Sequence, residues 1–135
     1  MSNLNLTSAP APPEGKESIR VNKAAGRING YISVLKFVDK DTKQFMIFCP
    51  SLDITGYGET GKKAIEMLKF SILEYFEYLI KLPSKQIESE LNKFGWKQNR
   101  LRHKQYSKAY VDINGELQNF NAVDNKVERL TLHAA

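Results

Sequence analysis

Apolar and polar positions along the chain alternate in several short segments with the period of a β-strand. The segments are 18–22, 31–38, 44–49 and 127–133, and they contain the β-branched and aromatic residues that are common in strands. In 44–49 the apolar residues occupy both faces, which predicts a strand covered on both sides. The polar residues 39–42 predict a turn, so 31–38 and 44–49 are expected to form an antiparallel hairpin.

A further short strand is expected after Pro50, because proline removes a backbone donor and interrupts the hydrogen-bonding ladder. Leu52, Ile54 and Tyr57 carry its apolar pattern, and the strand ends in Gly56-Tyr57-Gly58. Glycine adopts positive φ at little cost, so the two glycines predict a turn or a bulge.

Helical spacing begins after Thr60, which is expected to be the N-cap of a long helix. Pro83 ends this helix, because the residue before a proline avoids helical backbone angles. Ser84 is the expected N-cap of a second, shorter helix that ends near Gly95, and Trp96 is expected to pack that helix onto the body. The apolar stripe of the long helix consists of Ala64, Ile65, Leu68, Ile72, Phe76 and Leu79.

Together, these segments predict an α+β fold. It consists of a small, mostly antiparallel sheet packed on one long helix, a second short helix and a β-rich C-terminal extension. Residues 1–16 contain three prolines and few large apolar side chains, so a disordered tail is expected there. Residues 17–96 form the predicted core, and 97–135 form a basic segment and an extension of the same domain. Asn114-Gly115 predicts a hairpin turn between two strands of that extension.

Length and composition indicate one globular domain. The chain has 135 residues, with 41% hydrophobic and 26% charged residues, which are ordinary values for such a domain. The single Cys49 cannot form an internal disulfide and is expected to be buried and reduced. We expect a cytoplasmic protein, because no secretory signal pattern and no uncharged apolar run of membrane-spanning length is present.

A basic segment is the best nucleic-acid signal in the sequence. The chain carries 20 Lys and Arg against 15 Asp and Glu, a net charge of +5, which is compatible with an acidic or nucleic-acid partner. A solvated loop, or an edge strand that its charges keep from pairing, explains the same pattern. The residues that would contact phosphates are Lys97, Arg100, Arg102, Lys104 and Lys108.

No enzyme is predicted. Residues 56–62 have the spacing of a phosphate-binding loop, but Lys63 stands where Mg²⁺ coordination needs Ser or Thr. His103 and His133 have no Cys or acidic residue at metal-ligand spacing, and Cys49 lies in no nucleophile motif. We therefore expect no catalytic residue, no metal and no cofactor. Simple anion binding at the start of the long helix stays open.

The segment FCPSLDITGYGETGKKAIEMLKFSILEYFEYL resembles the HicB-like antitoxin domain. The pattern is a hydrophobic strand, a proline, a short strand with glycine, a Gly-Glu-Thr turn and a helix with alanine near its start. It is carried by Phe48, Pro50, Leu52, Gly56, Gly58, Glu59, Thr60 and Ala64. The sequence departs from the family at Lys62 and Lys63, where acidic residues are usual. The resemblance implies a truncated ribonuclease H-like fold without catalytic carboxylates.

The resemblance also implies a function, namely neutralisation of a small basic ribonuclease toxin by masking its surface. The residues expected to bind that partner are Asp53, Tyr57 and Glu59 in the turn region, and Met67, Phe70 and Leu73 on the helix. Burial of the three helix residues against the C-terminal extension is the competing explanation. A stand-alone nucleic-acid-binding protein that uses residues 97–108 is the alternative function, and a homodimer is compatible with both. No DNA-binding helix-turn-helix or ribbon-helix-helix pattern follows the HicB-like part.

Overall fold

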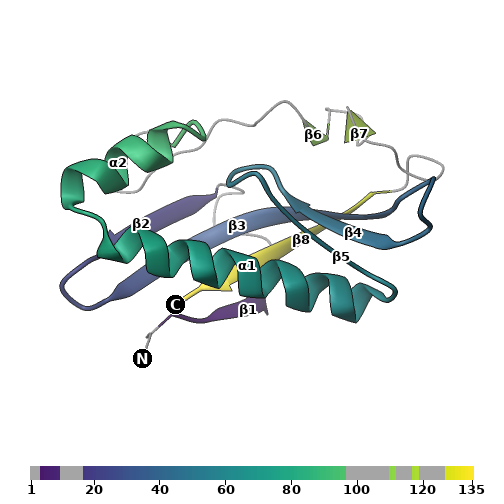
Figure 1. Ribbon diagram of the computed structural model, residues 1–135, viewed down its shortest axis with the longest axis horizontal. Helices are drawn as coiled ribbons and strands as arrows, with labels where there is room; N and C mark the ends of the chain where they lie inside the picture. The colour runs from purple at the N-terminus through teal and green to yellow at the C-terminus, as the bar shows by residue number, and fades with distance from the viewer. Residues whose placement is uncertain (1–3, 10–16, 97–109, 112–116, 119–126) are drawn as a thin grey trace.

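The protein folds as an antiparallel sheet with one long helix across one face, in a computed structural model (Figure 1). The structure describes residues 4–9, 17–96, 110–111, 117–118 and 127–135. Its strands are β1 (Leu6–Ala9), β2 (Ser18–Asn22), β3 (Arg27–Val38), β4 (Phe45–Cys49), β5 (Ile54–Gly58), β6 (Tyr110–Val111), β7 (Leu117–Gln118) and β8 (Glu128–Ala134), and its helices are α1 (Gly61–Lys81) and α2 (Ser84–Asn92). The predicted α+β fold class is confirmed.

Strand β3 is the centre of the main sheet, whose order is β1-β8-β3-β4-β5 with β2 also paired to β3. Gly30 and Tyr31 pair with β8 and with β2, so these two strands lie on opposite edges of β3. β2 and β4 therefore follow one another along the same edge of β3. Between them the backbone N–H of Ser33 donates to the Glu17 carboxylate at 3.0 Å, which supplies an acceptor where no strand is paired.

The predicted tail between residues 1 and 16 contains a strand, so the expectation of disorder is wrong for Leu6–Ala9. This strand, β1, pairs with β8 in the register Leu6 to Ala134 and Ala9 to Thr131. A strand of four residues gives only a weak alternation signal in the sequence, and the prolines that follow it favour a disordered tail. The strand is specified by a partner more than a hundred positions away, which local composition does not reveal.

The main core lies between α1 and the sheet face that α1 covers. Ile32, Val34 and Ile47 contribute from the strands, and Leu68 and Phe76 contribute from the helix; each is 2% exposed or less. The predicted helical stripe is confirmed except for Ile65, which is only partly buried. A second, smaller cluster of Leu35, Phe37 and Phe48 lies on the opposite face, which we call the distal face. Strand β4 therefore has buried side chains on both faces, as its sequence predicts.

Helix α1 is held at both ends by hydrogen bonds. The Thr60 hydroxyl accepts from the Lys63 backbone N–H at 3.1 Å, so the predicted N-cap is confirmed. At the other end the Lys23 ammonium donates to the carbonyls of Ile80 and Leu82 at 2.7 and 2.6 Å. Lys23 lies in the turn between β2 and β3, and it satisfies carbonyls that the last helical turn leaves free.

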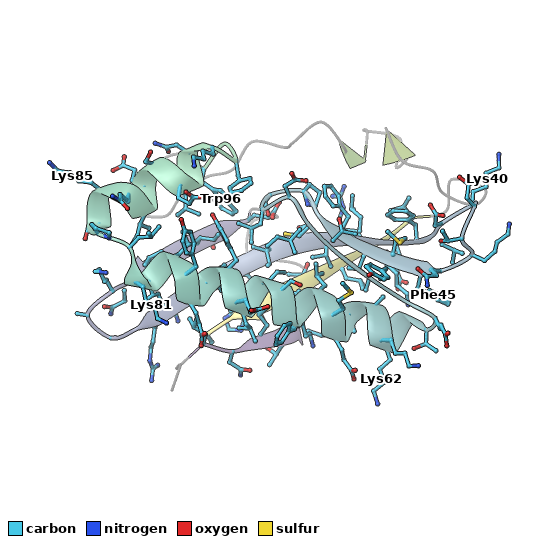
Figure 2. The ribbon with its side chains drawn as sticks, viewed as in Figure 1. Lys40, Phe45, Lys62, Lys81, Lys85 and Trp96 are labelled. Carbon is cyan, nitrogen blue, oxygen red and sulfur yellow. The ribbon has the colours of Figure 1, made fainter. Side chains whose placement is uncertain are left out.

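Helix α2 is fixed onto the body by Trp96, which is fully buried (Figure 2). Its indole N–H donates to the Ser51 carbonyl at 2.8 Å, which confirms the predicted packing role. Ser84 is the first residue of α2 and not its N-cap, because Pro83 occupies the cap position and offers no side-chain acceptor. Gly95 has a φ of 90°, as expected for the glycine that follows a helix.

Two further predictions concern hairpins. Asp39 accepts hydrogen bonds from the backbone of Asp41 and Thr42 and from the Thr42 hydroxyl, so the turn between β3 and β4 is a side-chain-stabilised turn. These hydrogen bonds, those from Thr42 first, lower the pKa of Asp39. Strands β6 and β7 pair antiparallel, as the Asn114-Gly115 pattern predicts, although the turn itself lies outside the described residues.

Candidate functional site

Strand β5 and helix α1 form one continuous unit, in which the helix returns across the strand that precedes it. Strand β4 ends at Cys49, immediately before Pro50, and a turn that contains Asp53 with a φ of 53° leads into β5. Glu59 and Thr60 then connect β5 to α1. Because the connection is so short, α1 must pack directly on β5.

Gly56 and Gly58 allow this close approach. A Cβ atom on Gly56 would lie 2.5 Å from the Ala64 carbonyl oxygen and 2.6 Å from the Leu68 nitrogen, and one on Gly58 would lie 2.7 Å from the Lys63 Cβ. Neither glycine has positive φ, so the predicted turn or bulge conformation is wrong. The two glycines are required because the helix backbone occupies the space of a side chain. Their packing role accounts for the spacing that resembles a phosphate-binding loop.

Among the described strands, β5 is the last on its side of the sheet, and its outer edge is paired with none of them. The Tyr57 backbone N–H faces this edge and contacts the Met67 sulfur at 3.5 Å. A thioether is a weak acceptor, so this contact leaves the donor available to a stronger one. Edge strands with available backbone groups are where another polypeptide adds a strand to a sheet.

Exposed aromatic side chains lie on β5 and on the helix that packs against it. Among the described residues, the large hydrophobic side chains that are exposed are Tyr57 (49%), Phe70 (64%) and Tyr78 (50%). All three belong to β5 or α1, and half-buried Met67 lies between strand and helix. We call Tyr57, Met67, Phe70 and Tyr78 the edge surface. Exposed aromatic side chains near an open strand are typical of protein-binding surfaces.

The structure separates the six residues that the sequence assigns to partner binding. Asp53 and Glu59 are exposed in the connections before and after β5, Tyr57 is exposed within β5, and Phe70 is exposed on the outer side of α1. Leu73 instead packs against the main core. Six residues separate Met67 from Leu73, which corresponds to a rotation of about 600° along the helix. The two side chains therefore point about 120° apart around α1. Leu73 consequently does not belong to the edge surface.

Tyr78 belongs to the edge surface and was not predicted. It lies eleven residues after Met67, which is about three helical turns, so both residues share one line along α1. This spacing is the sequence signal for Tyr78. It was hidden because Tyr78 is also close in sequence to the buried Phe76 and Leu79, which define the core stripe.

Tyr75 marks the junction between α1, α2 and the edge surface. Its ring contacts Phe94 edge to face, with the centroids 6.0 Å apart, and it lies 6.1 Å from the ring of Tyr78. Its hydroxyl is buried and has no hydrogen-bond partner among the described residues. Burial, followed by the negative charge of Glu90, raises the pKa of the Tyr75 phenol above its ordinary value. Tyr75 is therefore a neutral packing group here.

The other residues that the sequence suggests for binding or chemistry either lie outside the described residues or have a structural role. The basic residues Lys97, Arg100, Arg102, Lys104 and Lys108 lie outside the described residues. Cys49 is fully buried and contacts the Ser51 hydroxyl at 3.4 Å. In the described part of the chain, no three His, Cys, Asp or Glu side chains are arranged to hold a metal ion. No helix in that part has the length and apolar character needed to cross a membrane.

Comparisons of the chain with protein-family models, with curated proteins and with solved structures found no match.

Proposed function

We propose that the protein is a non-enzymatic, cytoplasmic protein-binding module of the HicB-like antitoxin type, which neutralises a small basic ribonuclease toxin by masking its surface. The edge surface is the observation that carries the proposal. Phe70 is 64% exposed, although it lies in the middle of a helix whose other apolar side chains are largely used in the core. Exposure of this group to water is unfavourable, and a partner that covers it removes that cost.

The backbone geometry of β5 supports this mode of binding. A partner strand that pairs along the outer edge would accept from the Tyr57 N–H in place of the weak Met67 contact. The partner's side chains would then lie beside Tyr57 on the distal face and beside Met67 on the face toward α1. Main-chain hydrogen bonds would supply affinity, and the aromatic contacts would supply specificity.

Charge near β5 suits a basic partner. Asp53 and Glu59 lie at the two ends of the strand, and both are exposed. The ion pair of Glu59 with Lys63 is long, at 3.8 Å, and both side chains are solvated, so it holds Glu59 only weakly. These two carboxylates are available to cationic side chains that approach the edge.

The alternative is a stand-alone nucleic-acid-binding protein that uses residues 97–108. Its residues lie outside the described part of the chain, and it remains an alternative on the strength of their charge alone. The two functions respond differently to salt, because phosphate contacts weaken steeply as salt rises and an apolar protein interface does not. A homodimer through the edge surface would be compatible with the protein-binding function.

Affinity capture with matched variants tests the proposal. Tagged full-length chain is incubated with its native cytoplasm, treated with nuclease, washed at moderate salt and characterised by mass spectrometry. We expect a stoichiometric small basic protein that arrests growth when it is expressed alone and does not arrest growth when it is co-expressed with this chain. Phe70→Lys should reduce capture at least tenfold, since it places a charge in the apolar contact.

The control is Glu88→Gln on α2, which changes the net charge by the same amount away from the edge surface and should leave capture unchanged. Equal loss in both variants would show that net charge and not the edge surface governs binding. Recovery of nuclease-sensitive material alone would contradict the proposal and favour the nucleic-acid alternative. Capture of this same chain alone would indicate a homodimer and would also contradict the antitoxin function.

A further inference from the structure

The distal face of the sheet, opposite α1, carries an unusual distribution of charge. Alternation along the paired strands places Arg20 of β2, Arg27 of β3 and Arg129 of β8 on this face, and all three side chains are exposed. They are all the arginines in the described part of the chain. The lysines described there lie instead in turns, on the two helices or, for Lys36, on the face toward α1.

No acidic residue occupies a distal-face position in the described strands. The registers place Glu128 opposite Lys36 on the face toward α1, and Glu17 is buried with its carboxylate bound to the Ser33 N–H. Within the described residues, none of the three guanidinium groups forms an ion pair with a carboxylate. No described side chain therefore neutralises the positive charge on this face.

An aromatic pair lies between the arginines. Tyr31 of β3 and His133 of β8 are directly opposite in the register, and their rings stack with centroids 4.6 Å apart and an angle of 16°. Both are partly exposed. Arg20 and Arg27 lie toward one end of β3 from this pair, and Arg129, which is opposite Leu35, lies toward the other.

The choice of arginine and the aromatic pair indicate the class of ligand. A guanidinium binds phosphate through two parallel N–H groups, which an ammonium cannot do. Stacked rings that project from a sheet offer a planar surface to a nucleobase, and sheets combine such rings with cations to bind single strands. Eight residues of β3 separate the rows of Arg27 and Arg129, a span of ~27 Å at ~3.4 Å per residue. This length accommodates several nucleotides.

We propose that the distal face binds single-stranded nucleic acid, with Arg20, Arg27 and Arg129 contacting phosphates and the Tyr31–His133 pair stacking on a base. This site shares no residue with the edge surface or with the basic segment 97–108, and it does not depend on the proposed antitoxin function. Net positive charge of the whole chain favours the same ligand without specifying where it binds.

Fluorescence anisotropy with the full chain tests the site, using labelled twelve-nucleotide oligo(U) and oligo(dT) over a range of salt concentrations. The combined change Arg20→Ala, Arg27→Ala and Arg129→Ala should weaken binding at least tenfold. It should also reduce the magnitude of the log–log salt slope by ~2, since each phosphate contact with a single strand contributes ~0.7. Tyr31→Ala should weaken binding at least ~5-fold with little change in slope, because stacking is not electrostatic.

The matched control removes three lysines from the helices: Lys62→Ala, Lys81→Ala and Lys85→Ala, at positions that Figure 2 shows on α1 and α2. It makes the same change in net charge and should leave affinity within about twofold. Circular dichroism and thermal unfolding establish that each variant is folded. Substitutions of exposed charged residues usually change stability little. A second comparison changes Lys97, Arg100 and Arg102 to alanine.

Three results would overturn the proposal. Wild-type protein could fail to bind either oligonucleotide at low salt. The arginine and lysine variants could lose affinity equally, which would show that binding follows net charge alone. The change at Lys97, Arg100 and Arg102 could abolish binding while the arginine variant of the distal face retains it, which would assign binding to the basic segment. Retention of binding in that segment variant, together with its loss in the distal-face variant, would support the site.

Discussion

The two faces of the sheet are built from the same strands but differ in the kind of side chain that they carry. The face toward α1 is apolar over most of the described strands, and its side chains interlock with one helix in a continuous core. The distal face is apolar around Leu35, Phe37 and Phe48, and its other positions on β2, β3 and β8 are polar or basic. Strand β3 contributes to both, because consecutive residues point to opposite sides.

Stability and candidate binding are therefore divided between the two faces of the sheet. A strand residue toward α1 is committed to packing, whereas a distal residue away from the small cluster is free to serve recognition. The division predicts large stability effects on the first face, smaller ones in the distal cluster, and negligible ones at the distal arginines. Four measurements test this division.

A pair of identical substitutions on the two faces gives the largest expected effect. Leu68→Ala should lower the free energy of unfolding by about 4 kcal/mol, because Leu68 is fully buried in the main core. Leu35→Ala, in the smaller of the two clusters of described residues, should cost about 2 kcal/mol, the lower end of the range for this substitution. Urea unfolding followed by circular dichroism measures both. A loss at Leu35 equal to that at Leu68 would contradict the division of the faces.

Gly56→Ala tests the close contact between β5 and α1. The added methyl group meets helix backbone that cannot move independently, so we expect a loss of about 3 kcal/mol in unfolding free energy. Gly61→Ala is the control: its Cβ would meet the flexible end of Lys36, and alanine favours the helix that begins there. Thermal unfolding should show a lower Tm for the first change only. Equal Tm values would mean that the helix approaches β5 less closely than described.

Lys23→Met removes the hydrogen bonds at the end of α1 and retains the length of the side chain. The carbonyls of Ile80 and Leu82 lose a charged donor, and we expect a loss of about 1 kcal/mol. Lys40→Met, at the tip of the other hairpin, is the matched control and should change stability by less than about 0.5 kcal/mol. Chemical denaturation of the two variants provides the measurement, and indistinguishable midpoints would count against the capping role.

The smallest effect concerns Asp39 and depends on pH. Its pKa is lowered in the folded protein from an ordinary value of 3.8, so its contribution to stability is present above that value and is lost as the pH falls through the folded pKa. Asp39→Asn should therefore lower Tm slightly at pH 7 and have no effect at strongly acidic pH. Thermal scans across this range test the sign. A difference that grows as the pH falls would contradict it.

Local features of the fold follow from the sequence because a few neighbouring residues determine them. Thr60 caps α1 through the N–H three residues away, Pro83 ends the helix before it, and Asp39 forms its turn within four residues. These interactions require no knowledge of the tertiary structure. The confirmed boundaries of β2, β4 and α1 have the same origin.

Features that depend on distant partners could not be predicted. Strand β1 exists because β8 pairs with it, and Lys23 caps a helix end 57 residues away. In the sequence, Gly56 indicates only a backbone position with conformational freedom, which predicts a turn. The close packing of α1 on Gly56 is visible only in the folded structure. Of the candidate site, the apolar character of Tyr57 and Phe70 points to them in the sequence. Leu73 packs partly against the core and Tyr78 is exposed, and both depend on how α1 is rotated on the sheet.

The pairing of β3 with β8 has a consequence for folding kinetics. Strands β3, β4 and β5 and helix α1 follow one another in sequence and can assemble early, but the second edge of β3 is completed only when residues 128–134 arrive. Contacts over such separations slow the search for the native state, and proteins rich in them fold in roughly milliseconds to seconds. During synthesis the edge of β3 toward β8 would stay unpaired until the last strand emerges from the ribosome, and association with other nascent chains would compete there.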